Sequence, residues 1–284
     1  MQENPNITII GPGAMAEAII AGLLRQQLTP PENIIASGPR IERGAELHQH
    51  YGIQPYQENV LAVKKADVVI LSVKPQRLQK VLSELSGAIK PEALVISIVA
   101  GASIQTLADG LNHHCIVRSM PNTPAQIGEG ITVWYASETV SDEQIELARQ
   151  ILAALGQEIL VEDENYLDMA TALSGTGPAY IFLFMEALMD AGVHLGFPRR
   201  IAEQLVIQTL RGSVDYYENQ SVHVADLRNK VTSPGGTSAE ALYYLEKAGF
   251  RTAISRAIWA AYERSKELGK GLESDAPDKK DESK

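Results

Sequence analysis

The chain has 284 residues, enough for one large domain or two modest ones. Its formal net charge of −10 argues against a nucleic-acid or membrane-surface partner, because such partners attract basic patches. A single cysteine excludes an internal disulfide. The N-terminus has no secretory pattern, and no apolar stretch reaches the roughly 18 to 20 residues of a membrane span. We therefore expect a cytoplasmic protein with no membrane partner.

The first part of the chain alternates short apolar runs with helical patterns. The first run is followed directly by a predicted helix over 14–26. Continuous apolar strands between helices are typical of a parallel sheet covered on both faces. Residues 1–162 are therefore predicted to form an α/β domain. Its predicted strands are 7–10, 33–37, 67–73, 94–99, 116–120 and 131–135.

The pattern changes to helices, with almost no strand signal, from about residue 163. Helices so apolar are not stable as isolated exposed elements, so residues 163–268 are predicted to form an all-α domain that pairs with a second copy. The polar residues 269–284 lack periodicity and predict a disordered tail. The predicted helices are 178–195, 198–217, 227–232, 238–247 and 251–268.

A glycine pattern, G-x-G-x-x-A at residues 11–16, separates the first predicted strand from the first predicted helix. Gly11 permits a tight turn, Gly13 has no side chain to block a pyrophosphate, and Ala16 keeps the helix close to the strand. The helix start then presents free N–H groups to the phosphates. The order of strand, loop and helix predicts a Rossmann-type dinucleotide site, the alternative being a glycine-rich turn without a ligand.

The end of the second predicted strand indicates which dinucleotide is bound. NAD-specific sites usually place an Asp or Glu there, whereas this chain has Ser37 and, after a Gly-Pro pair, Arg40. Ser37 can donate a hydrogen bond to a 2′-phosphate and Arg40 can neutralise it. Glu42 lies one turn too late to be the usual acid. The pattern favours NADP over NAD, and a solvated surface role is the alternative for Arg40.

A run of small polar residues with paired glycines, 231–238, precedes another predicted helix. The N–H groups of Gly236, Thr237 and Ser238 are expected to point forward from the helix start and to bind a carboxylate. The alternative for Ser238 is an N-cap. Two further loops are candidate ligand contacts, because Asn122 follows a strand end and Pro178 opens the long apolar helix.

Several residue patterns are absent from the sequence, and their absence limits the reactions that the chain is expected to catalyse. No Cys/His set has metal-ligand spacing, so no metal is expected. No lysine occurs between Lys90 and Lys230. Alcohol oxidation needs an acid or base for the hydroxyl proton. A protonated cyclic imine is already an electrophile, so a binding loop, one hydroxyl and a well-placed nicotinamide suffice through orientation.

In this order the motifs resemble the pyrroline-5-carboxylate reductase family over roughly residues 6–268. The resemblance implies a Rossmann-type N-terminal domain and an all-α C-terminal dimerisation domain, with homodimers that often assemble into larger rings. It also implies reduction of 1-pyrroline-5-carboxylate, a small cyclic imine acid, to L-proline in the last step of proline biosynthesis. The matching motifs are 11–16, 72–75, 120–125, 174–180, 196–199 and 231–237, the last being the most specific.

The resemblance also assigns site residues. Ser238 stands where the family usually has a threonine, and its hydroxyl near the imine nitrogen is the candidate catalytic group. The implied substrate contacts are Asn122, Pro178, Val231, Gly235, Gly236, Thr237 and Ser238. The implied NADP contacts, with Arg40 added from its charge, are Ile10, Gly11, Pro12, Gly13, Ala14, Met15, Ser37, Asn59, Ser72, Val73, Lys74, Pro75, Ala100 and Gly101.

Three other functions are open at this stage. A hydroxy-acid dehydrogenase of the same build generally uses a lysine on the long helix, and residues 178–195 contain none. A reductase for a six-membered cyclic imine is a second possibility, because the sequence barely discriminates between five- and six-membered rings. A non-catalytic nucleotide sensor would not need both the glycine loop and the 231–238 loop.

Overall fold

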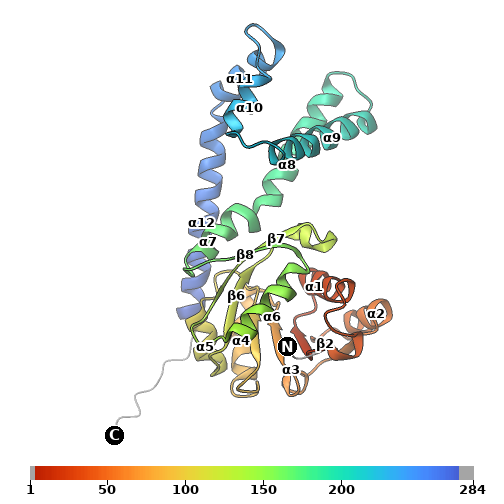
Figure 1. The fold of residues 1–284 in the computed structure, drawn as a ribbon, viewed down its shortest axis with the longest axis vertical. Helices are drawn as coiled ribbons and strands as arrows, with labels where there is room; N and C mark the ends of the chain where they lie inside the picture. The colour runs from red at the N-terminus through yellow and green to blue at the C-terminus, as the bar shows by residue number, and fades with distance from the viewer. Residues whose placement is uncertain (1–3, 275–284) are drawn as a thin grey trace. The chain divides into compact units, whose positions relative to one another are not determined.

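The computed structural model describes residues 4–274 and divides into two compact units (Figure 1). Among the described residues, the first unit holds 4–176 and 261–274, and the second holds 177–260. The predicted boundary at residue 162 therefore lies before the observed division. The reason is the short helix α7 (Tyr166–Ala170), whose Asp168 forms an ion pair with Arg118 of the sheet.

The first unit is built on an eight-stranded sheet of order β3-β2-β1-β4-β5-β6-β7-β8. The pairs from β3 to β6 are parallel, β7 is antiparallel to β6, and β8 is parallel to β7. Because β2 and β4 flank β1 on opposite sides, the strand order reverses there, and ligands bind at such points in open α/β sheets. The strands are β1 (Ile7–Ile10), β2 (Ile34–Ser37), β3 (Gln54–Tyr56), β4 (Val68–Leu71), β5 (Leu94–Ser97), β6 (Ile116–Met120), β7 (Gly130–Ala136) and β8 (Gly156–Leu160).

Side chains of the central strands alternate between two hydrophobic cores, one on each face of the sheet. Ile7 and Ile9 pack in the core that includes α1 and α6, whereas Ile10 packs in the core that includes α4 and α5. The prediction of a sheet covered on both faces is therefore confirmed. The predicted parallel pairing is found from β3 to β6 and between β7 and β8, whereas the pairing of β6 with β7 is antiparallel and corrects the prediction. The helices of this unit before α7 are α1 (Ala14–Arg25), α2 (Ile41–Tyr51), α3 (Asn59–Val63), α4 (Pro75–Leu85), α5 (Ile104–Leu111) and α6 (Asp142–Ala153).

The sequence did not predict β3 and β8, the two edge strands of the sheet. All three residues of β3 are exposed, and β8 has no buried residue. Edge strands pair on one side only and bury little surface, so they lack the apolar run by which the central strands were found.

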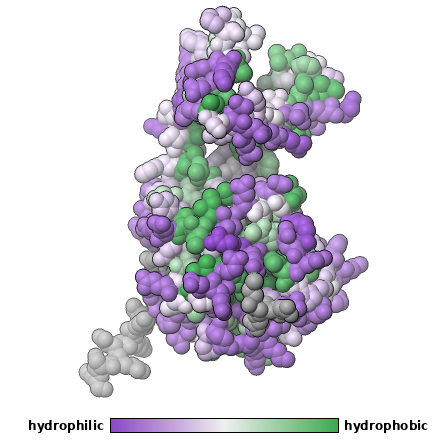
Figure 2. All heavy atoms as spheres, in the orientation of Figure 1, coloured by the Kyte–Doolittle hydropathy of each residue, from purple (hydrophilic) through white to green (hydrophobic). Residues whose placement is uncertain are grey.

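The second unit is entirely helical in its described elements, as the sequence predicts. Its buried hydrophobic residues are Ala202 and Leu227 alone. Large apolar side chains such as Phe182, Leu183 and Trp259 are exposed instead, at 61%, 66% and 65%; Figure 2 shows hydrophobic patches over these helices. Its helices are α8 (Gly177–His194), α9 (Arg199–Glu218), α10 (Val224–Lys230), α11 (Thr237–Lys247) and the first part of α12 (Phe250–Ser274).

The end of the described chain differs from the prediction. Helix α12 continues to Ser274, so the predicted disordered tail is wrong for residues 269–274. Close packing explains the extra length, since the backbone of Gly269 lies against that of Gly101 and Leu272 is buried in one of the sheet's cores. The remainder of the predicted tail, 275–284, lies outside the described residues.

Candidate active site

The glycine loop lies between β1 and α1, at the point where the strand order reverses. Gly11 has φ +93°, and a Cβ built on it would meet the Ser72 carbonyl oxygen at 2.7 Å, so only glycine fits here. A Cβ built on Gly13 meets nothing within 4 Å, so that side of the loop is open. Gly13 is also the N-cap of α1 and makes no side-chain cap bond. The first N–H groups of the helix therefore have no side-chain cap that would compete with a phosphate.

Arg43 of α2 holds this loop through a hydrogen bond to its backbone. Its Nε donates to the Pro12 carbonyl oxygen at 3.0 Å, and its guanidinium forms ion pairs with Glu17 and Glu46. The hydrogen bond from Arg43, joined by one from the Tyr51 hydroxyl, lowers the pKa of Glu17 in spite of partial burial. The loop is thus held by a charged network before any ligand binds.

A cleft of about 600 Å³ opens over the loop at the carboxyl ends of β1, β2 and β4. Four basic residues, Arg40, Lys74, Arg77 and Lys80, line it together with one acid, Glu84. A glycine turn, a free helix start and an excess of positive charge fit a dinucleotide with several phosphates. The predicted cofactor residues that line this cleft are Ile10, Gly11, Pro12, Gly13, Ser37, Arg40, Asn59, Ser72, Val73 and Lys74.

The other predicted cofactor residues lie outside this lining. Ala14 and Met15 are the first residues of α1, and Pro75 opens α4. Ala100 and Gly101 belong to the loop after β5, and Gly101 lines a different cleft.

Sequence reasoning missed the contribution of α4 to the cleft. Arg77, Lys80, Val81 and Glu84 all line it, at a spacing of three to four residues that places them on one helix face. This spacing, on a helix that begins just after the predicted contact Lys74, is the signal that was available. Gly38, Pro39 and Gln57 were missed as well.

Three side chains of the cleft form a chain of hydrogen bonds. The Ser37 hydroxyl donates to Asn59 Oδ1 at 2.8 Å, and Asn59 Nδ2 donates to a Glu84 carboxylate oxygen at 3.1 Å. Ser37 is fully buried at the end of β2, whereas Glu84 is exposed on α4. The hydroxyl that was predicted to face a 2′-phosphate therefore has a protein partner in this structure.

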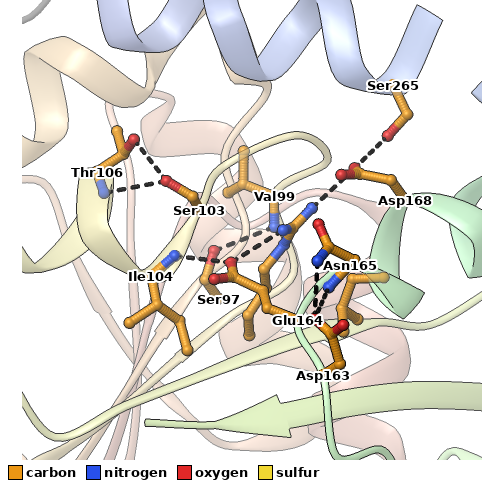
Figure 3. A network of polar contacts seen from close by, with 12 residues as sticks. Ser97, Val99, Ser103, Ile104, Thr106, Asp163, Glu164, Asn165, Asp168 and Ser265 are labelled. Atoms are coloured by element: carbon orange, nitrogen blue, oxygen red, sulfur yellow. Dashed lines mark hydrogen bonds and ion pairs between the residues drawn. The ribbon is translucent and has the colours of Figure 1, made fainter. Parts of the chain in front are cut away.

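A second, polar cleft of about 510 Å³ has Arg118 of β6 in its lining. Glu164 and Asp168, two further residues of the lining, belong to a network of polar contacts (Figure 3). Arg118 is 3% exposed and forms ion pairs with Glu164 and Asp168 at 2.9 and 3.0 Å. Glu164 also accepts from the N–H of Ile104 at 2.8 Å, and Asp168 accepts from the hydroxyl of Ser265 at 2.7 Å. This network connects the start of α5 and the end of α12 to the sheet, next to the loop that holds Ala100 and Gly101.

The predicted substrate loop lies in the second unit, before α11. Gly235 has φ +71° and Gly236 is the N-cap, so the helix begins at Thr237 and Ser238 is its second residue. The predicted alternative of Ser238 as N-cap is therefore wrong. The Gly236 N–H donates to the Ser233 carbonyl at 3.0 Å, which removes it from the predicted anion site. The N–H groups of Thr237 and Ser238 precede the first intrahelical bond, from Glu240 to Gly236.

The remaining predicted substrate residues are spread over both units. Asn122 follows β6 in the first unit, where Nδ2 donates to the Ser174 carbonyl at 3.2 Å and Oδ1 accepts from the Ile131 N–H at 3.0 Å. Its amide thus links the loop after β6 to the helical turn at 171–175 and to β7. In the second unit, Pro178 is the second residue of α8, and Val231 is the C-cap of α10 and 66% exposed.

Known proteins resemble the chain over nearly its whole length. Residues 164–268 match a family described as pyrroline-5-carboxylate reductase dimerisation, and residues 6–101 match one described as NADP oxidoreductase, coenzyme F420-dependent. A pyrroline-5-carboxylate reductase of Synechocystis is 44% identical, with 92% of this chain and 97% of the relative covered. One from Pseudomonas aeruginosa is 42% identical, with 94% and 98% covered. The chain belongs to the pyrroline-5-carboxylate reductase family.

Solved structures agree with this membership. The crystal structure of Plasmodium falciparum pyrroline carboxylate reductase with NADP bound has a TM-score of 0.87 and 32% identity, and covers 95% of this chain and 100% of its own. As a member of the family the protein is an oxidoreductase with an NAD(P)-binding α/β domain and a helical dimerisation domain. The predicted fold class is confirmed.

Membership also bears on one long apolar helical segment. The stretch Tyr166–His194 is long and apolar enough to cross a membrane by length and composition, and its most apolar 18-residue window has a mean hydropathy of 1.2 and is 6% buried. The expectation that no stretch reaches this threshold was therefore wrong. All of this stretch lies within the dimerisation match at 164–268, so a second copy of the chain is expected to cover its exposed apolar side chains.

Proposed function

We propose that this protein reduces 1-pyrroline-5-carboxylate to L-proline, with NADPH as its preferred reductant. The observation that carries the proposal is a phosphate-binding glycine loop, under a cleft rich in positive charge, in a chain 44% identical to a reductase of that name.

The preference for NADPH rests on charge. No acid ends β2, whereas Arg40, Arg77 and Lys80 line the same cleft. A 2′-phosphate adds negative charge, which these cations stabilise and which an acid at the end of β2 would repel. Arg40 is exposed, so its contribution is expected to be modest and to decrease with salt.

The chemistry requires little acid–base power from the protein. The residues of the cleft over the glycine loop would hold NADPH, whose chemistry would be the donation of a hydride to the carbon of the protonated C=N bond. The residues of the chain bind and orient the reactants. The first N–H groups of α11 hold the substrate carboxylate, and the Ser238 hydroxyl hydrogen-bonds near the imine nitrogen, so this loop orients the substrate.

The family match and the composition also support proposals for the assembly and the location of the protein. The dimerisation domain implies a homodimer, and we propose that dimers associate into a larger ring, as the resemblance to the family implies. The acidic composition and the single cysteine support a cytoplasmic location.

The direct test is to mix the purified protein with racemic 1-pyrroline-5-carboxylate and either NADPH or NADH, and to follow loss of the reduced cofactor. Activity with both, and a higher kcat/KM with NADPH, is expected. Arg40→Ala should raise KM for NADPH more than for NADH. Consumption only with a six-membered imine would reassign the substrate, and equal losses with both cofactors would remove the role of Arg40.

A further inference from the structure

The chain of hydrogen bonds from Ser37 through Asn59 to Glu84 has a fixed direction. An ionised carboxylate has no hydrogen to donate, so the side of the Asn59 amide that faces Glu84 must be its NH2 group. The amide oxygen then faces Ser37, and the Ser37 hydroxyl must donate to it.

The direction decides what Ser37 offers to a ligand in the cleft. Its one hydrogen is committed to Asn59, so its oxygen presents only lone pairs. A ribose 2′-hydroxyl can donate to those lone pairs, whereas an ionised 2′-phosphate has only acceptor oxygens. The same carboxylate also engages one of the two hydrogens of the Asn59 NH2 group.

We infer that Glu84 determines cofactor specificity as a positioning residue, acting through Asn59 and Ser37 to lower the preference for NADPH over NADH. This inference rests on the proposed function and qualifies its cofactor preference. The basic residues of the cleft favour the 2′-phosphate, and the Glu84 carboxylate opposes it, both by charge and by the donor direction it imposes. The cofactor preference is the balance of these two effects.

The test is Glu84→Gln, which keeps the shape and removes the charge. A glutamine can donate or accept, so the Asn59 amide is free to turn and Ser37 is free to aim its hydrogen at the ligand. Calorimetry with NADP⁺ and with NAD⁺ gives the ratio of their Kd values, and kinetics gives the corresponding ratio of kcat/KM. One hydrogen bond to a charged group predicts a change of roughly tenfold in favour of the phosphorylated cofactor.

Two further variants separate the hydrogen-bond chain from simple charge removal. Glu58→Gln removes the same charge one residue before Asn59, at a side chain that does not line the cleft, and should leave the ratio nearly unchanged. Ser37→Ala combined with Glu84→Gln should lose most of the gain, because the hydroxyl that benefits is absent.

The inference is overturned if Glu84→Gln leaves the ratio of Kd values unchanged, if Glu58→Gln reproduces the gain, or if the gain persists in full without the Ser37 hydroxyl. Melting temperatures check that each variant is folded. Failure of the proposed function has a different signature, since a protein inactive on the imine would still report its NADP⁺ to NAD⁺ ratio by calorimetry.

Discussion

A buried histidine couples the stability of the first unit to pH. His113 is 5% exposed, and its Nε2 lies 2.8 Å from the Ala93 carbonyl oxygen, an acceptor, so the neutral ring donates there. Burial lowers the pKa of His113 below its ordinary value of 6.5. Below about pH 6.5, His113 therefore binds a proton in the unfolded chain but not in the folded chain. The free energy of unfolding should accordingly fall as the pH drops below this value.

The measurement is urea unfolding at a series of pH values and one protein concentration. His113→Gln, although destabilising in itself, should remove this part of the pH dependence, whereas His114→Gln at the exposed neighbouring position should retain it. The acids with lowered pKa values, Glu17 and Asp67, lose their contribution only at lower pH, below their ordinary values of 4.5 and 3.8. A wild-type stability that is flat between pH 7 and pH 5 would contradict the argument.

Ser238 is the residue on which the proposed chemistry depends. Losing a hydrogen bond made in the transition state costs about 1.5 to 4 kcal/mol, so Ser238→Ala should lower kcat/KM for the imine by roughly ten- to a thousandfold. Affinity for NADPH should hardly change. Ser238→Thr should be active, because it restores the hydroxyl. Since Gly236 and not Ser238 is the N-cap of α11, the melting temperature should change little in either variant. A kinetically normal alanine variant would remove Ser238 from the mechanism.

Single residues also show the limit of reading a site from sequence. Gly11 and Gly13 were found because their role depends on a local turn, and such a turn can be recognised from residues adjacent in the sequence. Glu84 was missed because its role depends on Asn59, which lies 25 positions away in the chain. Hydrogen-bond partners that are distant in sequence leave no local pattern.

Among the elements, the central strands and the long helices were predictable, and the sheet edges were not. Residues 7–10 and 116–120 coincide with β1 and β6, both of which are mostly apolar and are buried along their whole length. The antiparallel direction of β7 was not predicted, since direction depends on the connection between strands and not on composition. The end of α12 was missed because its glycines and charged residues suggest a tail, whereas packing against the sheet stabilises a helix.

The end of α12 offers a matched pair of glycines. A Cβ on Gly269 would meet the Gly101 carbonyl oxygen at 2.7 Å, whereas a Cβ on Gly271 meets nothing within 4 Å. Gly269→Ala should therefore destabilise the first unit by about 1 to 3 kcal/mol, the usual cost of overpacking. Gly271→Ala should be neutral or stabilising by up to about 1 kcal/mol, because alanine favours helix.

Chemical denaturation of both variants checks this, and NADPH affinity gives a second measure. The loop that contains Gly101 is an implied cofactor contact, so Gly269→Ala should weaken cofactor binding while Gly271→Ala does not. Equal stability of the two variants would mean that α12 does not pack against Gly101 in solution.

We predict that the whole molecule requires a second copy of itself. The second unit buries only Ala202 and Leu227 among its hydrophobic residues, so it has almost no core of its own, and the family match assigns it to dimerisation. Apolar surface on this scale is covered in obligate dimers, where each copy completes the core of the other. We expect no stable, active monomer at micromolar concentration.

A substitution on each unit tests this requirement. Phe182 on α8 is 61% exposed and Ile127 in the first unit is 74% exposed, so a charge placed at either has access to solvent in an isolated chain. Phe182→Asp should produce monomers or aggregates with lost activity, because a buried interface cannot hold an unpaired carboxylate. Ile127→Asp should leave both assembly and activity intact. Sedimentation equilibrium at several concentrations gives the mass in each case, and a Phe182→Asp dimer of normal activity would place the interface elsewhere.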